Sequence, residues 1–253
     1  MKITFLGSGT SQGVPVIACN CDVCKSNDAN DKRLRASILL ETEEHTIVID
    51  AGPDFRQQML RENIQKLDAV LFTHEHKDHI AGLDDVRAFN FKFQKPMDIY
   101  GTSNVHEALK REFFYAFGDK SYPGLPLLHL VEIKNKSFSI EDILFLPIEV
   151  MHHKMPVFGY RIKNFAYITD AKTISSIEKQ KLLNLDILVL NALRNEKHIS
   201  HFNLDEALEL IKELNPKRAY LTHISHLLGK HAEVQSSLPP NVFLAHDGLC
   251  FEI

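Results

Sequence analysis

The segment VLFTHEHKDH (residues 70–79) joins a short apolar run to three histidines and one aspartate. The apolar half has the pattern of a buried strand, so the polar side chains begin where that strand ends. His74 and His76 are two positions apart, and in extended backbone both side chains point to the same side. They can hold one metal ion together, while Asp78 and His79 follow after a turn and can hold a second. Imidazole and carboxylate suit zinc, manganese or iron(II). The alternative is a histidine-rich surface loop.

Composition places the chain among ordinary globular proteins. Of its 253 residues, 44% are hydrophobic and 25% are charged, and a chain of this size can bury a large core. We expect one domain over residues 1–253. No apolar run approaches the about 18 residues of a membrane span, and no signal peptide is visible, so the sequence predicts a cytoplasmic location. The net charge of -4 provides no basic field for nucleic acid.

Three of the four cysteines, Cys19, Cys21 and Cys24, lie within six residues, and Cys250 is alone near the other end. In a reducing compartment such a cluster binds metal more often than it forms disulfides. A tetrahedral structural zinc needs four ligands, so the fourth must come from elsewhere in the chain. Unpaired, redox-sensitive loop cysteines are the alternative.

Further strands and helices are indicated by apolar periodicity and by turn residues. We expect a hairpin made by residues 35–41 and 46–49, and Asp50 follows its second strand. A buried aspartate at such a place commonly accepts a hydrogen bond from a metal-bound histidine, although a plain turn residue is the alternative. Residues 174–183 and 204–214 have helical patterns, the second beginning after Asn203 as N-cap. We also expect a final hairpin that pairs residues 242–244 with residues 249–251.

The motif at residues 73–79 resembles the HxHxDH motif of the metallo-β-lactamase superfamily of metal-dependent hydrolases. The opening TFLGSGTS (residues 4–11) and the segments around Cys19 and His223 are similar to the branch that contains the cyclic-phosphate phosphodiesterases of phosphonate breakdown. The resemblance runs along the whole chain. It implies an α/β fold, namely the four-layer αβ/βα sandwich of that superfamily.

The same resemblance implies two divalent ions, manganese or zinc or iron, at the catalytic site. The Lys154-x-Pro156 stretch and the following Gly159 favour His152 over His153 as the third histidine of the first ion, and the doublet leaves that choice open. Asp170 is similar to the carboxylate that bridges the two ions, with the N-cap of the next helix as its alternative role. The implied ligands are His74, His76 and His152 for one ion, Asp78, His79 and His223 for the other, and Asp170 for both.

Two more histidines receive roles from the resemblance. His226 is similar to the residue that completes a structural zinc site with Cys19, Cys21 and Cys24. His201 is similar to a histidine that donates a proton to the leaving oxygen, and a plain helix-entry histidine is its alternative. Together with Asp78, His201 is the implied catalytic residue.

The expected function is hydrolysis of a small phosphodiester, cyclic phosphodiesters included, by a hydroxide held between the two ions. Within the same fold, a thioester or lactone hydrolase is the alternative, and a non-catalytic metal-binding scaffold is the alternative from another class. We expect a small-molecule substrate, no nucleic acid partner and no membrane partner. A homodimer is left open, as is the role of the aromatic residues 113–117, which suit a lid or a dimer surface.

Overall fold

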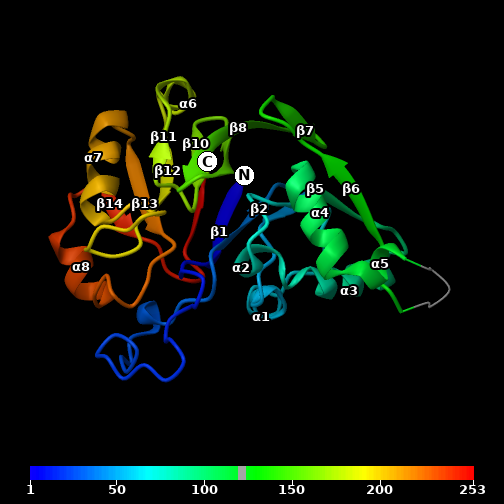
Figure 1. The fold of residues 1–253 in the computed structure, drawn as a ribbon, viewed down its shortest axis with the longest axis horizontal. Helices are drawn as coiled ribbons and strands as arrows, with labels where there is room; N and C mark the ends of the chain where they lie inside the picture. Colours follow the sequence, from blue (N-terminus) through cyan, green and yellow to red (C-terminus); the bar gives the residue numbers. More distant parts are fainter. Residues whose placement is uncertain (119–123) are drawn as a thin grey trace.

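The computed structural model describes residues 1–118 and 124–253. In these ranges the strands form two sheets that pack face to face, and helices cover the outer face of each sheet (Figure 1). The predicted four-layer αβ/βα sandwich is therefore confirmed. Within the described ranges, no helix has both the length and the apolar character needed to cross a membrane.

The first sheet carries the segment with the HxHxDH motif. Its central and later strands, from β3 to β6, run parallel, so their carboxyl ends meet at one edge of the sheet. The loops that follow β3 and β4 are therefore neighbours, which brings Asp50 beside the motif. In spatial order the strands are β15 (Cys250–Glu252), β1 (Lys2–Gly7), β2 (Ser37–Glu41), β3 (Thr46–Ile49), β4 (Ala69–Leu71), β5 (Met97–Gly101) and β6 (Leu128–Glu132).

The second sheet supplies the remaining candidate site residues. Its strands β10, β12, β13 and β14 are parallel, so the segments that follow them also meet at one edge. A long antiparallel pair, β8 with β9, lies beside them. In spatial order the strands are β11 (Thr173–Ile174), β8 (Ile143–His152), β9 (Met155–Ile162), β10 (Phe165–Ile168), β12 (Ile187–Asn191), β13 (Arg218–Thr222) and β14 (Val242–Leu244), and β7 (Phe138–Ile140) pairs with β8.

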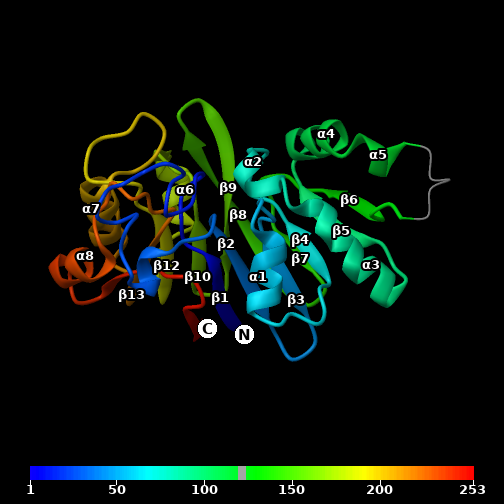
Figure 2. The ribbon, with the colours of Figure 1, turned by 90° about the horizontal axis from the view of Figure 1, so that it is seen from below.

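The helices separate into two groups, one on each sheet (Figure 2). Apolar residues of α1, η2, α3 and α4 pack against the first sheet, and those of α7 and α8 pack against the second. The helices are η1 (Ala29–Asp31), α1 (Phe55–Arg61), α2 (Lys77–Ile80), η2 (Leu83–Val86), α3 (Arg87–Phe93), α4 (Ser103–Glu112), α5 (Phe114–Phe117), α6 (Ser176–Gln180), α7 (Leu204–Leu214) and α8 (His231–Ser237).

A third apolar cluster fills the space between the two sheets. Phe5, Phe145, Tyr160, Phe165 and Tyr167 are its largest fully buried members. Burying a side chain of this size contributes about 1.5–3 kcal/mol. The strand ends that carry the candidate site are thus held by a rigid, close-packed core.

The local predictions agree with most element positions, and two need correction. Helix α7 begins after Asn203, whose side chain forms a capping box with Glu206. The expected helix over residues 174–183 is shorter, since α6 begins after the N-cap Ser175. The predicted final hairpin is wrong, because β14 joins the second sheet and β15 pairs with β1 of the first. Between them, the Asp247 carboxylate accepts hydrogen bonds from the backbone N–H groups of Ser8 and Leu34, which ties this turn to the N-terminal loop.

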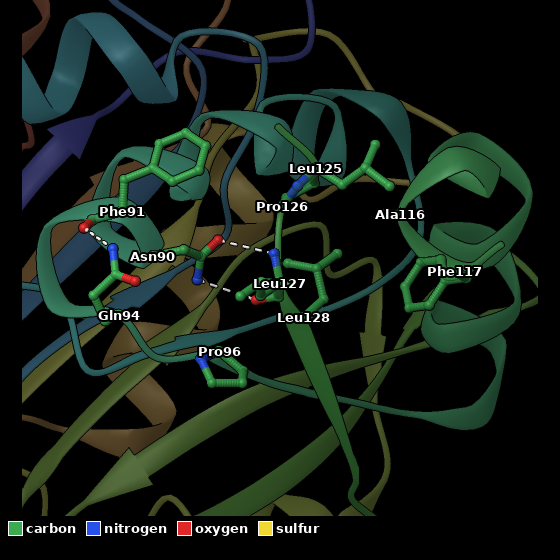
Figure 3. Close-up of a pocket in the computed structure, with 10 residues that line it drawn as sticks. All are labelled: Asn90, Phe91, Gln94, Pro96, Ala116, Phe117, Leu125, Pro126, Leu127 and Leu128. Carbon is green, nitrogen blue, oxygen red and sulfur yellow. Dashed lines mark hydrogen bonds between the residues drawn. The ribbon is translucent and has the colours of Figure 1, made fainter. Parts of the chain in front are cut away.

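The aromatic segment at residues 113–117 lies next to an apolar pocket (Figure 3). Phe113 packs in the core, whereas Phe114 is 71% exposed. The hydroxyl of Tyr115 donates to the carboxylate of Asp84 in η2, which follows the HxHxDH motif. In the pocket wall, the Asn90 amide bonds both the N–H and the carbonyl of Leu127 and so joins α3 to β6. None of the residues that line the pocket belongs to the histidine cluster; they are Asn90, Phe91, Gln94, Pro96, Ala116, Phe117 and residues 125–128.

Candidate active site

The predicted site residues gather where strands of both sheets end. The HxHxDH motif follows β4, and Asp50 follows β3. From the second sheet, His152 is the last residue of β8, Asp170 follows β10 and His223 follows β13. Residues far apart in the sequence therefore meet in one place, because parallel strands of each sheet point the same way.

Three of these residues share an uncommon backbone conformation. Asp50, Asp170 and His223 have φ values of 67°, 57° and 56°, all in the left-handed region. Side chains with a Cβ adopt this region only when the surrounding structure enforces it, at a cost of about 1–3 kcal/mol each. Such strain gathers at functional sites, and here it lies at the ends of three buried strands.

Asp170 lies at the centre of the cluster. Its two carboxylate oxygens are 3.2 Å from His79 Nε2 and 3.2 Å from His223 Nε2, and Oδ1 is 3.7 Å from Nδ1 of His201. Two ligands of one tetrahedral ion with bonds near 2.0–2.1 Å lie about 3.3 Å apart. The distances from the Asp170 oxygens to Nε2 of His79 and of His223 are therefore close to the distance between two ligands of one ion. Metal-ligating atoms lie within 4.8 Å of one another in the groups His74–His79–Asp170, Asp78–His79–His223 and His152–Asp170–His201.

The predicted ligands of the two ions adjoin each other, since the rings of His74 and His79 lie 4.1 Å apart between centroids. Asp78 Oδ2 is 3.2 Å from His79 Nε2 and 3.8 Å from His223 Nε2. The ring of His76 lies 4.7 Å from that of His74 and 5.2 Å from that of His152, measured between ring centroids. The structure therefore brings all seven predicted ligands together.

The histidine doublet divides clearly. His152 ends β8, and its Nδ1 lies 3.1 Å from the carbonyl oxygen of Asp170. His153 is exposed in the turn that leads to β9, with φ of 57°. His152 belongs to the cluster, and His153 lies outside it.

Hydrogen bonds fix the orientation of several imidazole rings. Asp50 is fully buried and accepts from His79 Nδ1 at 2.8 Å and from the backbone N–H of Thr73 at 2.9 Å. The hydroxyl of Thr73 lies 2.9 Å from Nδ1 of His74. With Nδ1 engaged, each ring presents Nε2 to the cluster, as metal-ligating histidines do. Asp50 therefore occupies the supporting position that the sequence predicted for it.

Burial and charge make the cluster suited to cations. Among the described residues, Nε2 of His74, of His79 and of His223 makes no hydrogen bond, although carboxylate oxygens lie 3.2 Å from the latter two, and all three atoms are buried. Such buried atoms require a partner, and a metal ion can supply it. Burial lowers the pKa of His74 well below its ordinary value. Burial opposes ionisation of Asp170, but His223 and His79 outweigh it and hold its pKa well below the usual range. Burial also opposes the charged form of His79, but Asp50, Asp170 and Asp78 outweigh it and raise the pKa of His79 well above its ordinary value, so a metal ion would displace a proton from that ring. Neutral imidazole and ionised carboxylate are the forms that bind metal.

His201 lies against the cluster from the loop between β12 and α7. Its ring stacks on His223 with centroids 4.8 Å apart and lies 4.5 Å from the ring of His152. Burial, followed by the nearby His223, lowers the pKa of His201 to about 3. In the free site His201 is thus a neutral N–H donor. The same loop brings the ring of His198 to 5.1 Å from the ring of His201, measured between centroids. No role was predicted for His198, although its H-x-x-H spacing to His201 is visible in the sequence.

The cysteine cluster forms a second, separate group. The thiol sulfurs of Cys19, Cys21 and Cys24 lie 3.3, 3.3 and 3.6 Å from Nδ1 of His226. A zinc ion with bonds of 2.3 Å to sulfur and 2.0–2.1 Å to nitrogen separates such ligands by about 3.5 Å. The backbone N–H of Cys24 and then His226 lower the pKa of Cys21 to about 6, which favours its thiolate. The four predicted side chains therefore have the spacing of a closed tetrahedral site.

The chain is similar to several known proteins. A family model described as "Beta-lactamase superfamily domain" matches residues 45–224. A crystal structure described as a new diphosphatase from the PhnP family is 39% identical, with a TM-score of 0.93 over 100% of this chain and 97% of that one. An octanoyltransferase of Porphyromonas gingivalis is 40% identical over 98% of this chain and 51% of the relative.

A ribonuclease Z of Prochlorococcus marinus is 29% identical over 70% of this chain and 55% of the relative. This chain thus spans about half the length of both of these curated relatives. The names of those relatives describe longer proteins, of which the matched part is one portion.

Proposed function

Because this chain belongs to the metallo-β-lactamase superfamily and to its PhnP family, we propose that it is a metal-dependent hydrolase of small phosphodiester or diphosphate substrates. The observation that carries the proposal is that Asp170 belongs to two groups of candidate ligands, one with His74 and His79 and one with His152 and His201. One carboxylate shared by two groups of histidines is the arrangement that two-metal hydrolysis uses.

The residues fit a pair of divalent cations. Such a pair, when bound, supplies water of lowered pKa at neutral pH and positive charge against the phosphoryl oxygens. Manganese, zinc and iron(II) all accept a mixed set of imidazole and carboxylate ligands. In our proposal His74, His76 and His152 hold one ion, Asp78, His79 and His223 hold the other, Asp170 contacts both, and a third ion, a zinc, occupies the cysteine cluster with His226.

The chain's own residues then orient the reaction. Asp50 fixes the ring of His79 through the 2.8 Å bond to Nδ1, so that Nε2 stays aimed at the cluster. His201 is buried next to Asp170 and His152, and it is not needed as a ligand in our assignment. We assign to His201 the contact with the leaving oxygen, to which the N–H of its neutral ring donates a hydrogen bond.

A second candidate function is hydrolysis of an acyl thioester. The octanoyltransferase relative favours it, because that protein is 40% identical to this chain and its name describes acyl transfer. However, this chain matches 51% of that protein, and the remaining half can carry the acyl chemistry. We therefore place the thioester after the phosphodiester.

The test compares substrates and metal content in one preparation. We expect about three metal ions per chain by elemental analysis, together with hydrolysis of bis(4-nitrophenyl) phosphate or of a diphosphate diester. Replacing Asp78 by Ala removes a ligand, so we expect activity to fall by about 10³-fold, the scale on which loss of a main electrostatic contributor acts. Glu75→Ala in the same segment is the matched control and should keep activity. Turnover of an octanoyl thioester alone would favour the second candidate, and a fully metal-loaded protein without any hydrolysis would favour a scaffold.

A further inference from the structure

The loop that carries His201 holds a second histidine that the proposed reaction does not yet use. This loop joins β12 to α7, and its two ends are tied together by the bond from Leu193 N–H to the Phe202 carbonyl, 3.0 Å. Phe202 N–H in turn bonds the carbonyl of Ala171, next to Asp170, at 2.8 Å. The base of the loop is therefore fixed to the same strand end as the central carboxylate.

The middle of the loop is braced from inside. The guanidinium of Arg194 donates to the carbonyls of Glu196 and Lys197 at 3.4 and 3.2 Å. The side-chain amide of Asn203 donates to the carbonyl of Asn195 at 2.8 Å. These bonds give the loop a defined shape, so the side chains it presents to the site have fixed places.

The orientation of the His198 ring follows from its bond to Ser200. The backbone N–H of Ser200 donates to Nδ1 of His198 at 3.3 Å. A nitrogen that accepts from an N–H carries no proton itself, so in the neutral ring the proton is on Nε2. His198 is half-buried, and the described part of the chain offers no acceptor to its Nε2. His198 is thus a fixed N–H donor, one ring farther out than His201.

The basic side chains near His198 are already engaged. Burial lowers the pKa of His198, and Arg194, His152 and Lys172 lower it further. Lys172 is paired with Glu206 at 2.7 Å, and Arg194 donates to the loop carbonyls. The N–H of His198 is thus the donor left to contact a ligand, and such a donor suits the oxygens of an anion.

We propose that His198 forms a subsite for an anionic leaving group, so that this enzyme prefers a diphosphate linkage to a phosphodiester with a neutral leaving group. The inference rests on the proposed hydrolase function and names its substrate class. His201 contacts the oxygen of the breaking P–O bond, and His198 donates to the oxygens of the second phosphoryl group. That group departs as a phosphate with the electron pair of the broken bond, while the water oxygen joins the attacked phosphorus.

The first experiment measures binding without turnover. Inorganic diphosphate and inorganic phosphate are titrated calorimetrically into the metal-loaded protein at constant free metal concentration. The subsite contacts only the second phosphoryl group, so His198→Ala should weaken diphosphate binding by about tenfold, the loss expected for one hydrogen bond to a charged group. Phosphate binding should stay unchanged. His198→Gln, which keeps an N–H donor, should recover part of the affinity, and Lys197→Ala is the matched control on the same loop.

The second experiment separates a substrate contact from a packing role. We expect His198→Ala to raise KM for a diphosphate diester and to leave hydrolysis of methyl 4-nitrophenyl phosphate unchanged. Equal losses on both substrates, or equal weakening of phosphate and diphosphate binding, would show that His198 only supports His201 and would overturn the subsite. Unaltered diphosphate binding in the variant, or none in the wild type, would overturn it as well. A selective binding loss in a protein that hydrolyses neither substrate would instead keep the subsite and reject the hydrolase function.

Discussion

The two candidate metal clusters differ in how the fold supports them. The histidine–aspartate cluster is assembled from strand ends of both sheets, and its members Asp170 and His223, together with the supporting Asp50, are buried and in left-handed backbone. The cysteine cluster is assembled from one N-terminal loop and one later histidine, and Cys19, Cys21 and His226 are only half-buried. The first depends on the core of the whole protein, whereas the second depends on a local loop.

The ligand types point in the same direction. Three thiolates and one imidazole fill a tetrahedral zinc and leave no position for substrate. Imidazoles and carboxylates around a shared aspartate leave positions open for water and substrate. The clusters are nevertheless linked, because His223 and His226 are three residues apart and Ile224 between them exchanges backbone hydrogen bonds with Ser8 and Thr10. The comparison predicts chemistry in one cluster and support in the other.

The largest expected effect comes from the histidine doublet, which provides a matched pair inside the first cluster. Loss of a residue that only orients a metal ligand lowers activity by about 10- to 100-fold. His152→Asn removes a proposed ligand itself, so activity should fall by more than that. His153→Asn alters an exposed turn residue, and Asn tolerates its left-handed backbone. Metal content and kcat/KM of both variants provide the measurement. Equal losses in the two variants would remove His152 from the ligand set.

A smaller effect is expected at Asp50, which touches the first cluster only through other residues. Asp50→Asn keeps the shape of the side chain but loses the carboxylate that accepts from His79 Nδ1. We expect metal affinity and kcat to fall by about 10- to 100-fold. Competition with a chelator gives the affinity, and circular dichroism checks the fold. An affinity equal to that of the wild type would mean that the orientation of His79 is set by packing alone.

Sequence reasoning located the parts of the site that depend on local pattern. The apolar run before His74 predicted β4, and the polar residues after it predicted the loop at its carboxyl end. The choice between His152 and His153 needed the register of β8 with β9, which places His152 opposite Met155 and leaves His153 in the turn. Pairing between distant strands decides such a position, and no local pattern contains it.

Two of the misassigned or overlooked features have the same cause. Residues 242–244 and 249–251 have strand patterns on either side of a Gly-containing turn, which is typical of a hairpin. The Asp247 side chain instead binds the distant Ser8 and Leu34, and the two strands enter different sheets. His198 was overlooked because its place beside His201 depends on the folding of the whole loop between β12 and α7. Both are long-range features.

The smallest effect on activity is expected from Cys21→Ser, which tests the second cluster. Serine cannot supply a thiolate, so one metal ion per chain should be lost and about two should remain. The free energy of unfolding should fall, but by less than the about 10–16 kcal/mol with which zinc binds a zinc-finger peptide. The apolar clusters of the two sheets do not depend on this loop. Elemental analysis, thermal unfolding and kcat at a temperature where the variant is folded provide the measurements.

Cys250→Ser on exposed β15 is the matched control and should lose no metal. Loss of activity in folded Cys21→Ser, with two metals retained, would show that the loop shapes the catalytic cluster through Ile224. The two clusters could then no longer be assigned separate catalytic and supporting roles.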